Sequence, residues 1–231
     1  MRRSESGVEV EMREVDAAGR LRVEGSYAER ADAAIPNKRR IAEVAVSSIP
    51  SGSVIFLDAG TTMFMLAEVL AQKCPGPLCV VTHSLRVAYL LGSVEEVEVR
   101  MLGGRLMAEE MCLLSSETMA ALSTYRFDMA FLSGGGMTQK GVWNSDPRLI
   151  LFQRSVISRS LEVWFCLDRM KAGKETGLFL APWRVADVLL TDATAADLAR
   201  ARISTRGIKV MNARSKPPIR PVRGVTRKAI Y

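Results

Sequence analysis

From residue 38 onward, short apolar segments rich in β-branched residues alternate with longer segments whose apolar residues recur every three or four positions. The first kind of segment is typical of buried strands and the second of amphipathic helices. Strands that alternate with helices pair in parallel, because each helix carries the chain back across the sheet. We therefore expect an α/β fold with a doubly wound, mostly parallel sheet.

The expected elements follow one another along most of the chain. The predicted strands are 53–58, 78–82, 97–102, 129–133, 163–167, 188–191 and 209–211. The predicted helices are 38–48, 62–72, 84–91, 117–123, 147–160 and a segment near 195–202. A chain of 231 residues with 48% apolar content can bury a core of this size.

The net charge of +7 is concentrated at the C-terminus. Residues 212–231 contain six cations, three prolines and no acid, which leaves the rest of the chain nearly neutral. Such a composition predicts a disordered basic tail. A solvated tail without a partner is the simpler interpretation, although any basic segment is attracted to nucleic-acid phosphates.

Membrane and secreted proteins are not indicated. The longest apolar runs, such as 54–57 and 129–132, fall far short of the roughly 20 residues that cross a bilayer. The first residues, Met-Arg-Arg-Ser-Glu, are not followed by the apolar core of a secretory signal. We expect a cytoplasmic protein with no membrane partner.

Metal chemistry is not indicated either. The four cysteines form no Cys-x-x-Cys pair, and the single histidine, His83, lies near none of them in the sequence. Cys112 and Cys166 lie in apolar runs, where a free thiol behaves as a small hydrophobic group. We expect reduced, structural cysteines, no metal and no cofactor.

Small polar residues follow four of the predicted strands. They are Asp58-Ala59-Gly60-Thr61-Thr62, Thr82-His83-Ser84, Gly103-Gly104 and Ser133-Gly134-Gly135-Gly136. In open α/β sheets, ligands bind beyond the carboxyl ends of the strands. We therefore expect the four strand ends to face one ligand-binding crevice.

The first of these segments suits a phosphate. Backbone amides at a helix start, the hydroxyls of Thr61 and Thr62, and close approach at Gly60 would all favour an anion. An alternative, which does not exclude the first, is that one threonine simply caps the helix. Asp58 would repel a phosphate, so we assign it to sugar hydroxyls or to bracing the loop.

Two further strand-end residues are candidates. His83 could donate to a phosphate or sugar oxygen, with a hydrogen-bonded structural role as the alternative. Lys171, after the strand 163–167, is a candidate counter-charge for a phosphate, with a solvated loop lysine as the alternative. The sequence contains no nucleophile elbow, P-loop, dinucleotide fingerprint or metalloprotease pair, so no catalytic residue is predicted.

Taken in order, these motifs resemble the DeoR family of bacterial regulators over about residues 4–211. The series consists of Lys38 with Ile41-Ala42, Phe56 to Thr62, Val80 to Leu85 with Val87-Ala88, Met101 to Gly104, Asp128 to Leu132, Gly141-Val142, and Asp168 with Lys171. The family's sensor domain is similar in fold to ribose-5-phosphate isomerase and CoA transferases, and binds phosphorylated sugars as effectors without turning them over. The resemblance implies an effector pocket formed by Asp58, Gly60, Thr61, Thr62, Thr82, Ser84, Gly103, Gly104 and Lys171, and His83 completes our candidate set.

Three positions depart from the family pattern. His83 stands where the family usually has asparagine, and Ser115 where it usually has glycine. Gln153, with apolar residues near 149–151, stands where the family has a glutamate and a lysine in a helix. Loss of a cation and a carboxylate would change which ligand binds, or whether one binds.

The N-terminus resembles the rear of a winged helix-turn-helix. Residues 3–21 are similar to the recognition helix and wing, and we expect the chain to carry only this part of the head. Glu9, Val10 and Glu11 occupy the region where the family has paired basic residues. Because a recognition helix needs the helix before it, and because carboxylates repel phosphates, we expect DNA binding by this chain alone to be weakened.

The resulting hypothesis has three segments. Residues 1–30 form a remnant of the DNA-binding head and a linker, 31–211 an effector-sensing α/β domain, and 212–231 the basic tail. We expect a DeoR-type transcriptional repressor, not an enzyme, that binds a sugar phosphate or related small anion and forms a homo-oligomer. The alternatives are a sugar-phosphate isomerase or transferase of the same fold, and an effector-insensitive oligomerisation partner of full-length regulators.

Overall fold

The computed structural model describes residues 27–204 and 207–214, and within them seven strands form one parallel sheet. The order across the sheet is β12-β11-β9-β6-β1-β2-β3, and every neighbouring pair is parallel. Its strands are β1 (Val54–Leu57), β2 (Leu78–Thr82), β3 (Val97–Met101), β6 (Phe127–Leu132), β9 (Ser160–Cys166), β11 (Val188–Thr191) and β12 (Lys209–Asn212). The expected parallel sheet is confirmed.

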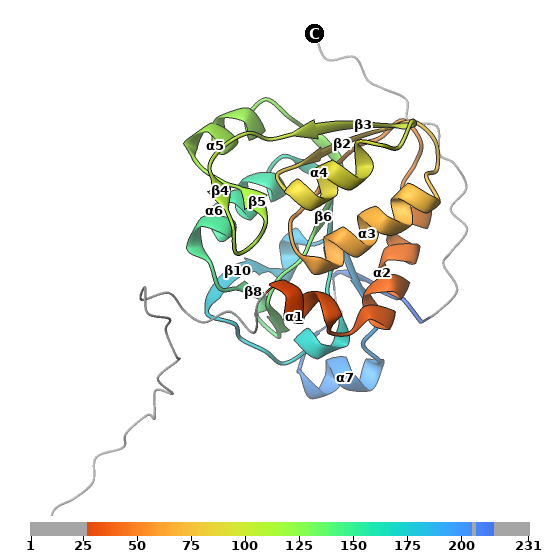
Figure 1. Ribbon diagram of the computed structural model, residues 1–231. Helices are drawn as coiled ribbons and strands as arrows, with labels where there is room; N and C mark the ends of the chain where they lie inside the picture. The colour runs from red at the N-terminus through yellow and green to blue at the C-terminus, as the bar shows by residue number, and fades with distance from the viewer. Residues whose placement is uncertain (1–26, 205–206, 215–231) are drawn as a thin grey trace, which may run out of the picture.

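Helices cover both faces of this sheet (Figure 1). They are α1 (Tyr27–Asp32), α2 (Ile35–Ser47), α3 (Thr61–Gln72), α4 (Leu85–Leu91), α5 (Ser116–Leu122), α6 (Pro147–Ile157) and α7 (Ala195–Arg200). Successive strand residues point to opposite faces, so Ile55 and Leu57 pack with α2, α3 and α4, whereas Phe56 packs with α5 and α6. The two apolar layers that result are the doubly wound arrangement.

Two small antiparallel sheets were not expected from the sequence. One has the order β10-β8-β7, from β7 (Gly136–Thr138), β8 (Gly141–Asn144) and β10 (Leu178–Pro182). The other is the hairpin of β4 (Leu106–Met107) and β5 (Cys112–Leu113), which lies against the end of β2, where Leu113 N donates to His83 O at 2.8 Å. Short 3₁₀ turns span Arg169–Lys171 and Trp183–Val185.

Several predicted boundaries are wrong by two or three residues: α2 begins at Ile35 instead of residue 38, and β6 at Phe127 instead of residue 129. The helix expected over 147–160 ends at Ile157, and β9 begins at Ser160, three residues before the predicted strand. The early start is explained by pairing, because Ser160 lies opposite Phe127 at the beginning of β6.

The ends of the chain limit what the structure says about the three predicted segments. The head remnant up to residue 26 and the tail from residue 215 lie outside the described residues. Asn212 is the last residue of β12, and α1 spans the predicted boundary between residues 30 and 31. Within the part of the chain that the structure describes, no helix is both long and apolar enough to cross a membrane.

The strand order creates a crevice between β1 and β6. From β1 the chain winds outward through β2 and β3, and then returns to place β6 on the other side of β1. The connections that leave β1 and β6 therefore run in opposite directions. In open α/β sheets the carboxyl ends of two such strands are where ligands bind.

Candidate functional site

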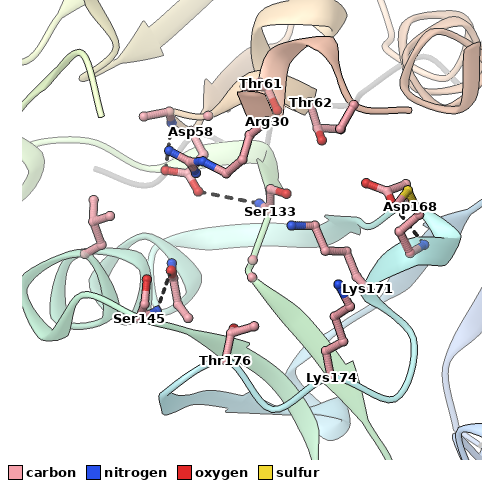
Figure 2. A pocket seen from close by; sticks show the side chains of 18 of the residues that line it. Arg30, Asp58, Thr61, Thr62, Ser133, Ser145, Asp168, Lys171, Lys174 and Thr176 are labelled. Atoms are coloured by element: carbon pink, nitrogen blue, oxygen red, sulfur yellow. Dashed lines mark hydrogen bonds between the residues drawn. The ribbon is translucent and has the colours of Figure 1, made fainter. Parts of the chain in front are cut away.

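A cavity of about 540 Å³ lies at the carboxyl ends of β1 and β6. Its wall is formed by the loop after β1 with the start of α3, the loop after β6, the region between β8 and α6, the loop of residues 168–177, and α1 with the start of α2 (Figure 2). The large sheet, the helices and the small β10-β8-β7 sheet thus all contribute to one partly open cavity.

Half of the predicted binding residues line this cavity. They are Asp58, Gly60, Thr61, Thr62 and Lys171. The other half, Thr82, His83, Ser84, Gly103 and Gly104, are not among the lining residues. The five that line the cavity come after β1 or β9. The other five lie at the ends of β2 and β3, with Thr82 as the last residue of β2.

The ends of β2 and β3 are occupied by internal contacts. The Thr82 hydroxyl donates to Leu57 O at 2.7 Å, and the Ser84 hydroxyl caps α4 by accepting from Val87 N. At the end of β3, a Cβ atom at Gly104 would lie 2.1 Å from Thr118 Oγ1. The β4–β5 hairpin is bonded to the end of β2, where Leu113 N donates to His83 O and Leu85 N donates to Met111 O.

The start of α3 can receive an anion. Gly60 is the N-cap residue, with φ 105° and ψ 166°, a backbone conformation that only glycine adopts readily. No side chain caps this end of α3 among the described residues, so the first-turn amides are not satisfied by a side-chain cap. Thr61 and Thr62 add hydroxyls to the same wall of the cavity.

Four cations line the cavity, Arg30, Lys38, Lys171 and Lys174, together with the carboxylates of Glu29, Asp58, Glu110, Asp168 and Glu175. Figure 2 shows the side chains of Lys171 and Lys174 pointing into the cavity. Burial lowers the pKa of Lys38, which is only 4% exposed, to about 8; Asp168 opposes the shift, and the positive charges of Lys171 and Arg30 add to it. An anion in the cavity would relieve this repulsion.

Asp58 braces the loop after β1. Its carboxylate is 2% exposed and accepts from Ala59 N at 2.9 Å, with His83 Nε2 at 3.1 Å from the same Oδ1 oxygen. The Oδ2 oxygen accepts from Gln153 Nε2 at 2.6 Å. Of the two roles considered for Asp58, bracing the loop is therefore the one that its contacts support.

His83 lies behind Asp58, away from the cavity. The ring is fully buried and stacks on Phe152 of α6 with the ring centroids 4.3 Å apart. Its second nitrogen, Nδ1, lies 3.3 Å from Leu113 O in the hairpin. The structural alternative considered for this histidine agrees with its contacts.

Gln153 links Asp58 to the opposite wall. Besides Asp58, its Nε2 donates to Ser133 O at 3.1 Å, and its Oε1 accepts from Asn144 Nδ2 at 3.0 Å. Asn144 Oδ1 in turn accepts from Ser145 N at 2.8 Å. A continuous hydrogen-bonded network therefore runs along the floor of the cavity and fixes its polar groups in place.

The glycine triplet after β6 serves packing. A Cβ atom on Gly135 would lie 2.2 Å from Thr176 Oγ1, and one on Gly136 would lie 2.2 Å from Lys174 O. These glycines let the loop of residues 168–177 approach the start of β7. They position Lys174 and Thr176 on the cavity wall, and Gly134 and Gly135 also line the cavity themselves.

Sequence reasoning missed several lining residues. They are Arg30, Lys38, Glu110, Ser133, Asn144, Ser145, Lys174 and Thr176. Lys38 and Ser133 stood in motifs that the sequence singled out, but the other six lie on α1, on the hairpin or near the β10-β8-β7 sheet. No periodicity marked those elements, so no signal led to their side chains.

Neither a metal site nor a reactive thiol is evident. No group of three His, Cys, Asp or Glu side chains is placed to hold a metal ion within residues 27–204 and 207–214. Burial, reinforced by nearby Asp58 and Glu110, raises the pKa of the Cys112 thiol to about 12, and burial raises the pKa of the Cys166 thiol as well. These thiols stay protonated at neutral pH.

Comparison with family models identifies the domain type. Residues 33–193, more than half of the chain, match the model described as the DeoR C terminal sensor domain. The match includes the strands β1 to β11 and all the lining residues except those on α1.

Curated relatives are named as regulators of transcription. The chain is 30% identical over 168 residues to the HTH-type transcriptional repressor GlcR of Bacillus subtilis, which covers 72% of this chain and 64% of that protein. It is 29% identical over 157 residues to the glycerol-3-phosphate regulon repressor of Escherichia coli, covering 68% and 62%. A lactose phosphotransferase system repressor of Streptococcus mutans is 30% identical, covering 66% and 60%. The match thus spans less than two thirds of each of these relatives.

Solved structures show partial likeness. A ribose 5-phosphate isomerase from Methanocaldococcus jannaschii aligns with a TM-score of 0.43 and 16% identity, covering 58% of this chain and 52% of that chain. The eIF2B beta subunit of Chaetomium thermophilum aligns with a TM-score of 0.46 and 15% identity, covering 66% and 49%. Likeness of this extent adds nothing about the use of the cavity.

Proposed function

The chain belongs to the family of the DeoR C-terminal sensor domain, and on that premise we propose that it is the effector-binding part of a transcriptional repressor whose cavity binds a phosphorylated sugar or polyol. The observation that carries the proposal is the pairing of a glycine-capped helix start at Gly60 with four cations around one cavity at the switch point of the sheet. Such an arrangement favours a small organic anion.

The cavity has two chemically different ends. The start of α3, with Lys38 and Lys171 nearby, suits the phosphate, because backbone amides and cations there supply donors and positive charge. The opposite wall presents Ser145 and Thr176, whose neutral polar groups suit sugar hydroxyls. Thr176 Oγ1 is buried and has no hydrogen-bond partner among the described residues, so a ligand hydroxyl would satisfy it.

We propose no catalytic role for this site. An isomerase needs a carboxylate or another base within reach of the sugar carbons. Asp58 is buried and accepts from Ala59 and Gln153, and Asp168 is equally buried and accepts from Met170 N at 2.9 Å. The named relatives are regulators, in agreement with a site that binds without turnover.

The DNA-binding and oligomeric parts of the proposal rest on the family. We propose that a repressor of this kind acts in the cytoplasm as a homo-oligomer, with DNA contact weakened by the carboxylates of Glu9 and Glu11. DNA binding is tested by an electrophoretic mobility shift with the DNA upstream of the gene that encodes the chain. Oligomeric state is tested by sedimentation velocity of the purified protein. Tight binding by the chain alone would overturn the first, and a monomer at micromolar concentration the second.

A thermal-shift panel tests the effector class. Glycerol 3-phosphate, glucose 6-phosphate and ribose 5-phosphate are compared with inorganic phosphate and with the unphosphorylated glycerol, glucose and ribose. At about 100 times the dissociation constant a ligand stabilises the folded state by about 2.7 kcal/mol. Stabilisation by phosphorylated compounds and not by their parent sugars is expected, and the absence of any shift would overturn the proposal.

Two matched lysine variants test whether the phosphate binds in the cavity. Lys171→Met removes a cation of the cavity, whereas Lys209→Met removes an exposed lysine of β12 that does not line it. We expect the first variant to weaken the stabilisation by the phosphorylated compound and the second to leave it unchanged. Equal effects of the two variants would place the phosphate elsewhere.

A further inference from the structure

Arg30 reaches the cavity from outside the matched sensor domain. It lies on α1, which precedes residue 33, where the family match begins. Figure 1 shows α1 beside α3, and the Arg86 guanidinium lies 4.6 Å from the centroid of the Tyr27 ring on α1. The same guanidinium lies 5.1 Å from the Phe64 ring on α3, so stacked contacts attach α1 to the domain.

The side chain of Arg30 is held by Glu110. Its Nη2 atom donates to both carboxylate oxygens of Glu110, each at 2.9 Å, and the two side chains are only 22% and 13% exposed. Glu110 belongs to the turn between β4 and β5. A mostly buried ion pair therefore joins α1 to the hairpin across the edge of the cavity.

One N–H donor of the Arg30 guanidinium group forms no hydrogen bond among the described residues. Arg30 Nε is buried and has no hydrogen-bond partner among the described residues. A buried N–H without a partner costs stability, and this one belongs to a residue that lines the cavity. Figure 2 shows the Arg30 side chain among those that line the cavity.

The backbone of Arg30 is also bound by a cavity residue. Lys38 Nζ donates to the Arg30 carbonyl oxygen, and Lys38 is one of the cations that face the proposed ligand. Both the side chain and the carbonyl of Arg30 are thus contacted by cavity-lining residues. A ligand that binds Lys38 or the Arg30 guanidinium would therefore change the hydrogen bonds that attach α1 to the domain.

We propose that Arg30 is an effector-binding residue supplied by α1, and that the bound phosphate competes with Glu110 for its guanidinium. The inference rests on the proposed function, since it needs an anionic ligand in the cavity. A phosphate offers several acceptor oxygens to the planar fork of an arginine, including one for the unpartnered Nε.

Three variants test the competition. Arg30→Gln removes the guanidinium, Glu110→Gln removes the carboxylate that holds it, and Glu109→Gln removes the same charge from the neighbouring exposed residue, which does not line the cavity. Binding of glycerol 3-phosphate and of inorganic phosphate to the full chain is measured by titration calorimetry. Loss of a charged hydrogen bond weakens binding by about tenfold, so Arg30→Gln should weaken binding of both probes by about that factor. Glu110→Gln should tighten it several-fold, and Glu109→Gln should bind as the wild type does.

Hydrogen exchange supplies a second measurement on the same proteins. Without ligand, the amides of Tyr27–Asp32 should exchange faster in Glu110→Gln than in Glu109→Gln. Addition of glycerol 3-phosphate should slow them again in Glu110→Gln, because the ligand then holds Arg30. Unchanged exchange in both conditions would overturn the link between Arg30 and α1.

The outcomes separate this inference from the proposed function. If the wild type binds a probe and Arg30→Gln binds it equally, the inference is overturned and the proposed function stands. If Glu110→Gln binds more weakly than Glu109→Gln, the competition is overturned. If the wild type binds neither probe at millimolar concentration, the inference falls together with the phosphate-binding function.

Discussion

The side-chain amide of Gln153 donates a hydrogen bond of 2.6 Å to Asp58 Oδ2, joining α6 to the end of β1 across 95 residues of sequence. Both side chains are 2% exposed. The contact satisfies a buried carboxylate with a neutral donor. The same Nε2 also donates to Ser133 O, and Gln153 Oε1 accepts from Asn144 Nδ2. The floor of the cavity thus depends on an amide at position 153.

A carboxylate at position 153 should destabilise the fold. Gln153→Glu places two acidic groups within hydrogen-bond distance in a buried site, and breaking such a buried pairing costs about 3 kcal/mol. We expect the free energy of unfolding to fall by about that amount at pH 7 in urea titrations. The loss should shrink at pH 5, because the folded variant then binds a proton that the two carboxyl groups share.

A second variant controls for charge on the same helix. Leu151→Glu introduces the same carboxylate on α6 at a side chain that is 62% exposed. Its unfolding free energy should stay close to that of the wild type at both pH values. If both variants lose the same stability, the contact between Gln153 and Asp58 is not the cause.

The large parallel sheet was predictable because its signals are local. Most of its strands contain a short apolar run, and the helices between them have an apolar period of their own, so the alternation itself indicates the fold class. The small sheets gave no such signal. β4 and β5 are two residues long, and β7 begins at the third of three consecutive glycines, so their pairing depends on contacts distant in sequence.

The candidate site was predictable only in the half that follows β1 and β9. Sequence reasoning treated four strand ends as equivalent, but strand order decides which ends meet at a crevice, and the order is not local information. Thr82 and Ser84 carry hydroxyl groups, as Thr61 and Thr62 do. Their hydroxyls, however, form hydrogen bonds within the protein, with Leu57 O and with the start of α4. Arg30 could not be predicted as a site residue, because the helix that carries it has only six residues and is too short to show an apolar period.

Two glycines of the predicted set should behave differently when replaced by alanine. Gly60 has φ 105° and ψ 166°, so Gly60→Ala should cost about 1 to 3 kcal/mol of stability and displace the amides at the start of α3. Gly103 has no positive φ, and a Cβ atom there meets nothing within 4 Å. Gly103→Ala should therefore leave both stability and phosphate binding unchanged.

Chemical denaturation and thermal shift with glycerol 3-phosphate compare the two alanine variants. Weaker ligand stabilisation in Gly60→Ala alone supports an anion at the start of α3. Equal ligand stabilisation in both variants would contradict it, and a loss confined to Gly103→Ala would restore the end of β3 to the site.

Thiol reactivity should report on burial. Cys112 and Cys166 are fully buried, and burial raises the pKa of both thiols, that of Cys112 to about 12. Because the thiolate is the reactive form, neither should react with iodoacetamide in the native protein at pH 8. Both should react in urea, where the unfolded chain exposes them. Peptide mapping of labelled sites separates them from the partly exposed Cys74 and Cys79, and native labelling of Cys166 would contradict the packing between β9 and the helices.

The pH dependence of effector binding should reflect the protonation of Lys38. Burial lowers its pKa to about 8 in the free protein, and a bound anion favours the protonated form, so the complex holds more protons than the free protein above that pH. Affinity should therefore fall as the pH rises from 7.5 to 9.5, a range in which the phosphate, whose second pKa is about 6, keeps its charge. Calorimetric titration with glycerol 3-phosphate measures the slope. In Lys38→Met the affinity should be lower at pH 7.5 and the slope much shallower; an unchanged slope would assign the titration to another group.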